Sequence, residues 1–323
     1  MIISKTPFRC SLVGSSSDYE SYYSKYGALM LGFTMDKYCY ISVRRTPKIF
    51  DHGTRVSYSK IETVDDNYKI EHNGVRGCLE FLGIKDRLEI SCFSDLPART
   101  GIGSSSAFVV GLLNCLYKLK GESVSPKRLA KDAIHVERKC LSEIGGIQDQ
   151  IFVSYGGLKS VHIPKDGDFR IKPLPVSSEF VSDFFSRAIL IYTGQSRQSF
   201  KIAKSHDSEA AETYKHNIKA LAESMLYEFT NENIEGVADR LLESWWEKKK
   251  ISDLIATEEV DSLYNSLRED DGMLGGKLLG AGGSGFIFGI MESPAQKDKV
   301  REKYNHHYVE CGLSQYGSRI INE

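Results

Sequence analysis

The stretch that most constrains the fold runs from Asp95 to Lys118 and reads DLPARTGIGSSSAFVVGLLNCLYK. It follows a strand-like segment, LEISCFSD, and passes through a glycine and serine loop into a long apolar run. This order predicts a strand, a loop and a helix, with serines at the helix start. A helix N-terminus offers free N–H groups and a positive dipole end, so the loop is a candidate phosphate site. Plain helix capping by serine is the alternative.

The composition is that of a globular protein without a strong charge preference. Of the 323 residues, 26% are charged and 41% hydrophobic, and 42 lysines and arginines balance 43 aspartates and glutamates to a net charge of -1. We therefore expect no nucleic-acid partner. No apolar run reaches signal-peptide or membrane-spanning length, so we expect a cytoplasmic protein with no membrane partner. The seven scattered cysteines favour reduced core residues over disulfides or a zinc site.

The first half of the chain alternates between strand and helix patterns. Ser17 and Glu20 fit a capping box, and Ser125-Pro126 is a good helix start. After a break at Gly145-Gly146 we expect a strand at IFVSYGG. The other elements expected here are strands over 2–13, 33–43 and 54–64 and a helix over 72–83. Such a mixture predicts an α/β arrangement.

From about residue 165 the pattern changes to a second domain. A strand, AILIYTG, is followed by a charged helical region over 205–270, in which Trp245-Trp246 looks solvated. Residues 275–291, GGKLLGAGGSGFIFGIM, form a glycine loop and an apolar strand, and a last helix and the strand SQYGSRII complete the chain. On length alone, two domains are expected.

Three segments carry a resemblance to a known family. PARTGIGSSSAF resembles the second motif of the GHMP kinases, and GGKLLGAGGSGF resembles their third motif. The segment TPFRCSLVGSSSDYESYYSKYGALMLGFTMDKYCYISV resembles the first motif of a narrower group, the D-glycero-D-manno-heptose phosphate kinases and their fucose-kinase-like relatives. The resemblance implies an α+β, two-domain fold, with a ribosomal protein S5 domain 2-like domain over 1–165 and a ferredoxin-like domain over 166–323.

The resemblance also implies an ATP site. Its phosphate loop would comprise Pro97, Gly101, Gly103, Ser104, Ser105 and Ser106, and Gly280, Gly282 and Gly283 of the third motif would allow a close backbone approach. Glu137 lies on the apolar stripe of its helix, where a carboxylate is paired, partly solvated or a metal ligand. The family resemblance makes it a Mg²⁺ ligand together with Ser105. Arg99 stands where most members have glycine, and its role is left open.

The resemblance implies a substrate site beside the phosphate loop. Asp149 would be the general base and Arg9 would stabilise charge, although the residues alone favour an ordinary turn at Gly145-Gly146. Substrate contacts would come from Arg9, Ser16, Ser17, Asp18, Asp149 and Arg197. In the first motif serines largely replace the family's glycines, and Arg197 could equally be a surface residue.

The predicted function is ATP-dependent phosphorylation of the anomeric hydroxyl of a heptose 7-phosphate. The product would be the 1,7-bisphosphate, for nucleotide-activated heptose synthesis. Mg²⁺ is the expected cofactor, ATP and a phosphorylated sugar are the expected partners, and a homodimer is left open. Two alternatives stay open: a kinase for fucose or a hexose, and a noncatalytic sugar and nucleotide sensor.

Overall fold

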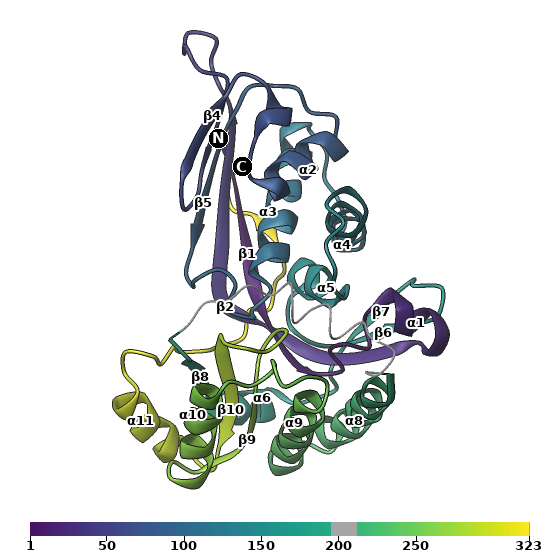
Figure 1. The fold of residues 1–323 in the computed structure, drawn as a ribbon, viewed down its shortest axis with the longest axis vertical. Helices are drawn as coiled ribbons and strands as arrows, with labels where there is room; N and C mark the ends of the chain where they lie inside the picture. Colours follow the sequence, from purple (N-terminus) through teal and green to yellow (C-terminus); the bar gives the residue numbers. More distant parts are fainter. Residues whose placement is uncertain (195–211, 323) are drawn as a thin grey trace.

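The computed structural model describes residues 1–194 and 212–322. Two long antiparallel strands, β1 (Ile2–Val13) and β2 (Ala28–Arg45), form the spine of an eight-stranded sheet, and both chain ends lie beside it (Figure 1). One half of β2 pairs with β6 (Leu158–Ile163) and the other half with β5 (Leu88–Ser94). The sheet is completed by β3 (Thr54–Ser57), β4 (Ile61–Val64), β7 (Arg170–Pro173) and β11 (Arg319–Ile320).

Helices cover one face of this sheet in Figure 1. The central one is α3 (Ser104–Leu119), an almost wholly buried helix that packs on β1 and β2. Gly111 allows this close packing, because a Cβ atom there would lie 2.8 Å from Oγ1 of Thr6. The other N-terminal helical elements are α1 (Glu20–Tyr26), the 3₁₀ turn Asn67–Lys69, α2 (Asn73–Phe81), α4 (Pro126–His135), the π-helical turn Val136–Cys140 and α5 (Gln148–Tyr155).

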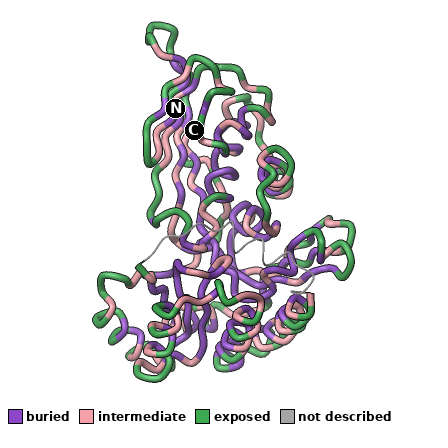
Figure 2. The backbone as a smooth tube through the Cα atoms, viewed as in Figure 1, coloured by how far each residue is buried: buried purple, intermediate pink, exposed green. Residues whose placement is uncertain are grey.

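The C-terminal half is built on a second, antiparallel sheet in the order β8-β10-β9. Aromatic contacts join it to the first sheet. For example, the ring centroids of Phe33 on β2 and Phe288 on β10 are 5.5 Å apart. Figure 2 shows that buried residues continue from one half of the molecule into the other. The elements are α6 (Ser178–Arg187), β8 (Ala188–Tyr192), α8 (Glu212–Thr230), α9 (Ile234–Lys249), α10 (Glu258–Glu269), β9 (Met273–Leu278), β10 (Phe286–Met291) and α11 (Pro294–Lys303).

Five local expectations are wrong in whole or in part. The segment IFVSYGG is not a strand, because Ile151, Phe152 and Val153 belong to α5 and are buried on several sides of a helix. Trp245 is packed into the core at 1% exposure, although Trp246 is exposed. No capping box forms, since the hydroxyl of Ser17 donates to the carbonyl of Gly14 and α1 begins at Glu20. In the last strand only Arg319–Ile320 is paired, and 54–64 is a hairpin of two strands.

Other expectations are confirmed. The strands at 2–13 and 33–43, the helix near 72–83 and the helix that Ser125 caps are all present. All seven cysteines are free. Across the described ranges, no helix is both long enough and apolar enough to cross a membrane.

The large sheet extends beyond the boundary expected at residue 165. A division between 165 and 166 would separate β6 from β7, which are paired in one sheet over Lys159–His162 and Arg170–Pro173. The C-terminal strand β11 also returns to β1. We therefore propose that the first domain runs through β7 and includes the C-terminal strand, with the second domain inserted between them.

Candidate active site

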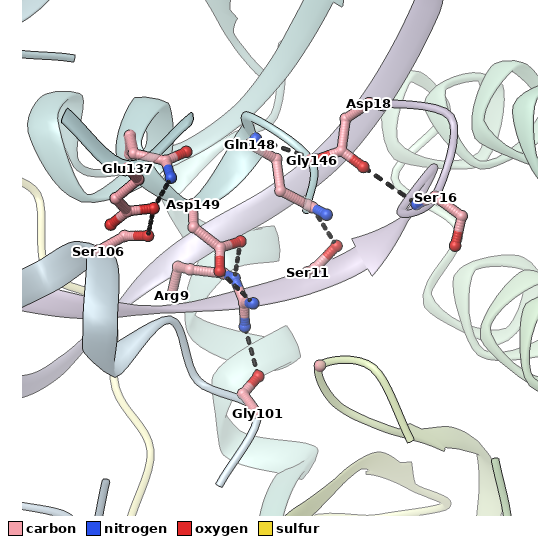
Figure 3. A network of polar contacts seen from close by, with 12 residues as sticks. Arg9, Ser11, Ser16, Asp18, Gly101, Ser106, Glu137, Gly146, Gln148 and Asp149 are labelled. Atoms are coloured by element: carbon pink, nitrogen blue, oxygen red, sulfur yellow. Dashed lines mark hydrogen bonds and ion pairs between the residues drawn. The ribbon is translucent and has the colours of Figure 1, made fainter. Parts of the chain in front are cut away.

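The candidate site is a cleft of about 240 Å³ where the two halves meet. It is lined by parts of β1, of the loop that follows β1, of the loop before α3, of the segment 137–149, and of strand β9 in the C-terminal half with its following loop. Figure 3 shows the polar side chains that these segments bring together.

The glycine and serine loop ends at the helix start expected from the sequence. Gly101 and Gly103 both have positive φ, at 84° and 74°, and α3 begins at Ser104. A Cβ atom on Gly103 would lie 3.0 Å from Cγ of Arg9, so this position must stay small. All three serines line the cleft together with Arg99, Gly101 and Gly103. The free N–H groups of a helix start therefore face a space suited to phosphate.

Pro97 and Arg99, the two other residues of this region, are both exposed, but only Arg99 lines the cleft. Pro97 is exposed and lies outside the cleft lining, and its carbonyl oxygen accepts a bond of 2.8 Å from the hydroxyl of Thr100. Arg99 is exposed at the cleft edge with a φ of 63°, a left-handed conformation that is uncommon for arginine. The glycine that most family members carry there adopts this conformation without strain.

Arg9 and Asp149 form the central ion pair of the cleft. Nε and Nη2 of Arg9 donate to the two carboxylate oxygens of Asp149 at 2.7 and 2.8 Å, the two-pronged geometry of a strong pair. Arg9 also donates through Nη1 to the carbonyl of Gly101 (Figure 3), and its backbone N–H donates to the carbonyl of Ile102. The Arg9 side chain is 5% exposed and the Asp149 side chain 25%, so the carboxylate stays accessible from the cleft.

Glu137 is a buried carboxylate with one unpaired oxygen. It lies on the π-helical turn after α4, is 1% exposed, and burial raises its pKa to about 7. Oε2 accepts bonds from Oγ of Ser106, at 3.1 Å, and from Nε2 of Gln150, and lies 3.5 Å from Nη2 of Arg138. Oε1 is buried and has no hydrogen-bond partner within the described part of the chain.

This environment fits a metal ion. An orphaned carboxylate oxygen beside serine hydroxyls, at the edge of a phosphate loop, is a donor set of the kind that Mg²⁺ uses. The family resemblance implies that the serine ligand is Ser105, which is exposed and lines the cleft, whereas the hydrogen bond to Glu137 comes from Ser106. Among the described residues, no three His, Cys, Asp or Glu side chains gather into a metal cage. Mg²⁺ bound with substrate phosphates requires no such cage.

Asp18 holds the first-motif loop against the segment that carries Asp149. One of its carboxylate oxygens accepts the backbone N–H of Ser16 and the other that of Gln148, both at 3.0 Å. Burial raises the pKa of Asp18. The neighbouring backbone must be glycine, because a Cβ atom on Gly146 would lie 1.8 Å from Oδ2 of Asp18. Asp18 therefore has a positioning role, and as a carboxylate it keeps lone pairs for a ligand.

The remaining sequence-predicted residues are distributed unevenly. Ser16 lines the cleft with a φ of 82°, whereas Ser17 is fully buried and bonds the carbonyl of Gly14. Gly280 lines the cleft, but Gly282 and Gly283 pack against Ile255. Arg197 lies outside the described residues. The backbones of the two glycine loops approach one another closely at Gly101, because a Cβ atom there would lie 2.5 Å from the carbonyl oxygen of Leu279.

Sequence reasoning missed four polar residues of the site. Gln148 accepts a bond of 2.7 Å from Oγ of Ser11, and Gln150 bonds Glu137. Recognising 148–155 as a helix would have placed both beside Asp149. Lys248 and Lys277 are buried lysines that line the cleft. No periodic signal marks a buried lysine, and only the position of Lys277 within the third motif, GGKLLGAGGSGF, could have suggested it.

An adjoining recess of about 440 Å³ lies between α1, α4 and the loop before α5. It shares Tyr19, Arg138, Glu143, Ile144 and Gly145 with the cleft, so the two spaces are contiguous. Its other lining residues include the basic side chains of Lys131, His135 and Lys139 and the carboxylate of Glu20, which lies 3.8 Å from Nζ of Lys139.

Family models match both halves of the chain. The model for the GHMP kinases N terminal domain matches residues 73–157, and the model for the GHMP kinases C terminal domain matches residues 218–310. The chain belongs to the GHMP kinase family. Membership of this family explains why an anion-binding loop, the carboxylates of Glu137 and Asp149, and a second glycine loop meet in one cleft. The protein is a phosphotransferase.

Individual relatives of this GHMP kinase include sugar kinases. D-glycero-alpha-D-manno-heptose 7-phosphate kinase of Campylobacter jejuni is 28% identical over 92% of this chain and 91% of its own length. Galactokinase of Thermotoga petrophila is 22% identical over 94% of each chain. The solved structure of a D-glycero-D-manno-heptose 1-phosphate kinase from Bacteriodes thetaiotaomicron superimposes with a TM-score of 0.81 at 21% identity, over 100% of this chain and 99% of that one. The two-domain GHMP kinase fold is therefore the fold of this chain.

Proposed function

We propose that this GHMP kinase transfers the γ-phosphoryl group of ATP to the anomeric hydroxyl of D-glycero-D-manno-heptose 7-phosphate, which gives the 1,7-bisphosphate. The observation that carries the proposal is the Arg9–Asp149 pair, with Nε to Oδ1 at 2.7 Å, in contact with the phosphate loop at Gly101. The relative from Campylobacter jejuni supports the choice of sugar.

In this proposal the residues of the cleft divide phosphate binding, positioning, proton transfer and charge neutralisation among them. The loop Gly101–Ser106 binds the phosphates of ATP through backbone N–H groups and hydroxyls. Asp149 orients the sugar hydroxyl and accepts its proton, while Arg9 holds the carboxylate in place and offsets negative charge on the transferring group. Phosphoryl transfer depends mainly on such positioning and charge neutralisation.

Mg²⁺ would be held by Glu137 and a serine of the first turn of α3. When bound, the ion neutralises negative charge on the phosphates of ATP. Ser105 is the ligand expected from the family, and Ser106 bonds the Glu137 carboxylate at 3.1 Å and keeps it aimed. The unpartnered Oε1 of Glu137 is the atom that supports this assignment.

The sugar would bind on the far side of Asp149 from the phosphate loop. Asp18 and Ser16 line that side of the cleft and offer acceptors and donors for sugar hydroxyls. Ser17 holds the conformation of their loop through its bond to the carbonyl of Gly14. The recess, which is lined by the basic side chains of Lys131, His135, Arg138 and Lys139 and by the carboxylates of Glu20 and Glu143, gives a phosphorylated side arm room and basic partners. Because ATP is the donor, the proposed reaction takes place in the cytoplasm.

A kinase for another sugar is the second candidate. The similarity to galactokinase favours it, because that protein matches over 94% of this chain, against 92% for the heptose 7-phosphate kinase. The adjoining basic recess favours a phosphorylated substrate instead. A noncatalytic sensor has no comparable support, since Asp149, Glu137 and the serine loop are all in place.

The deciding experiment measures ATP consumption with Mg²⁺ against heptose 7-phosphate, the unphosphorylated heptose, fucose and galactose. We expect turnover on the 7-phosphate with a kcat/KM well above that on any unphosphorylated sugar. Preferred turnover on fucose or galactose would replace the proposed substrate and keep the reaction class. Binding of ATP without turnover on any sugar would contradict the proposed activity.

A further inference from the structure

Lys277 is a buried lysine in the cleft wall, and the proposed function assigns it no part in binding or catalysis. Lys277 lies on β9, is 1% exposed and lines the cleft together with Arg9 and Asp149. Its Nζ atom donates to the carbonyl oxygen of Leu12 at 3.0 Å and to Oγ of Ser244 at 3.3 Å. An ammonium group carries three N–H donors. One donor of Lys277 therefore has no acceptor within the described residues.

The charge of Lys277 is also unbalanced. Within residues 1–194 and 212–322, no carboxylate forms an ion pair with it, and its charged neighbour on β1 is another cation, Arg9. The Cys10 thiol faces it from β1, and burial keeps the pKa of that thiol well above its ordinary value, so it supplies no negative charge at neutral pH.

The other elements that pack on β9 supply no counter-charge either. α9 contributes the hydroxyl of Ser244 and the ammonium group of Lys248, which bonds the carbonyl of Leu278. α10 contributes the hydroxyl of Tyr264, which bonds the carbonyl of Gly276. The paired strand β10 has no titratable side chain. A buried cation without a counter-charge is costly, so Lys277 favours an anion in the cleft.

We propose that Lys277 is a phosphate-binding residue, which pairs from the C-terminal half with the phosphate groups of the bound nucleotide while Arg9 acts from the N-terminal half. The proposal rests on the proposed function only in requiring that ATP enters this cleft, and it holds whichever sugar is phosphorylated. Its bond to the Leu12 carbonyl also ties the nucleotide site to β1.

A phosphate-binding role has a consequence that a purely structural lysine would lack. Burial lowers the pKa of free Lys277 to about 8, so part of the population is neutral at pH 8.5. A phosphate beside it favours the ammonium form, and nucleotide binding should therefore take up protons at that pH. Glu137, with a pKa of about 7, is already mostly ionised there and contributes little.

The test is calorimetric titration of a nonhydrolysable ATP analogue with Mg²⁺ at pH 8.5, in two buffers of different ionisation enthalpy. The wild-type protein should take up a fraction of a proton. Lys277→Met should lose this uptake and bind on the order of tenfold more weakly, as expected for a lost charge-assisted bond. Lys277→Arg should keep most of the affinity but lose the uptake, because arginine is always charged.

Lys297→Met is the matched control. Lys297 is a buried lysine of the same half, but it pairs with Glu310 at 2.7 Å and lies outside the cleft lining. It should keep both affinity and proton uptake. Equal nucleotide affinity and equal proton uptake in Lys277→Met and Lys297→Met would overturn the proposal. Proton uptake that persists in Lys277→Arg would also overturn it. The arginine variant therefore keeps the test informative if the methionine variant does not fold.

The two proposals fail in different ways. Normal proton uptake with no turnover on heptose 7-phosphate would reject the proposed substrate and support the role of Lys277. Turnover on heptose 7-phosphate without proton uptake on nucleotide binding would support the proposed substrate and reject the role of Lys277. A wild-type protein that binds no nucleotide would overturn both.

Discussion

At the scale of a single residue, the buried carboxylate of Glu137 lowers the stability of the metal-free protein when it is ionised. Its pKa is about 7 in the folded protein, against an ordinary value of 4.5 for glutamate, so the folded state binds more protons between these values. Stability therefore falls as pH rises from about 4.5 to 7, and the penalty is complete above pH 7. A metal ion that binds the ionised carboxylate offsets this penalty.

Glu137→Gln should therefore stabilise the metal-free protein at high pH. We expect the free energy of unfolding to rise by about 1 to 3 kcal/mol at pH 8 and to change little at pH 4.5. Denaturant titrations at both values, without Mg²⁺, measure this difference. Added Mg²⁺ and ATP should stabilise the wild-type protein more than the variant, and equal stabilisation of both would contradict the metal role of Glu137.

The choice between Ser105 and Ser106 shows what the sequence can settle at this scale. The three serines, the glycines before them and the helix start were all predictable from the pattern of residues. Successive helix residues point in directions about 100° apart, so only the structure decides that Ser106 faces Glu137 while Ser105 is exposed. The buried Lys277 was beyond prediction, because lysine is ordinarily a surface residue.

At the scale of elements, the Asp18–Gly146 contact joins the first-motif loop to α5. Gly146→Ala places a methyl group 1.8 Å from a carboxylate oxygen that is itself held by the backbone of Ser16 and Gln148. The loop and the helix start must then separate, which displaces Asp149. We expect kcat/KM to fall on the order of a hundredfold, as is typical when a reacting group is displaced by about 1 Å.

Gly145→Ala is the neighbouring control for that change. The atoms nearest to a Cβ there belong to the Arg138 guanidinium, at 3.0 Å, which bonds the carbonyls of Glu143 and Gly146. A shift of a few tenths of an ångström relieves this contact, so the variant should keep activity within severalfold of wild type. Comparable losses in both variants would show that the turn, and not its contact with Asp18, limits activity. Steady-state kinetics with a thermal melt of each protein separates the two outcomes.

The helix α5 is where element prediction failed most clearly. Ile151, Phe152 and Val153 read as a buried strand, because a short apolar run is ambiguous and Val and Ile favour strands. Tertiary packing decides the matter, since this helix is surrounded by protein and buries the residues from Gln150 through Ser154. The error also hid the first turn of α5, which places Gln148, Asp149 and Gln150 together.

At the scale of the molecule, the two halves share one core. Phe33 on β2 contacts Phe184, Phe185 and Phe288 of the C-terminal half, with ring centroids 6.5, 5.0 and 5.5 Å apart. A domain count from length and motifs was predictable, but this continuity was not, because contacts between distant segments leave no local pattern. The active-site cleft lies at the same junction.

Phe33→Ala should therefore destabilise the whole chain. We expect a loss of about 3 to 5 kcal/mol in the free energy of unfolding, the usual cost of deleting a buried phenyl ring. Calorimetry should show one transition in the wild-type protein, with its midpoint lowered in the variant. Two separated transitions in the wild-type protein would show that the halves unfold independently. An unchanged midpoint would show that the Phe33 contacts contribute little.

The central claim is that Asp149, held by Arg9, activates the sugar hydroxyl for phosphoryl transfer from ATP. The most direct test is kcat on heptose 7-phosphate for the wild-type protein and Asp149→Asn, with nucleotide affinity measured in parallel. Loss of a general base should lower kcat by about 10²- to 10⁴-fold while nucleotide affinity and thermal stability stay close to wild type. An Asp149→Asn enzyme with kcat within a few fold of wild type would contradict the account.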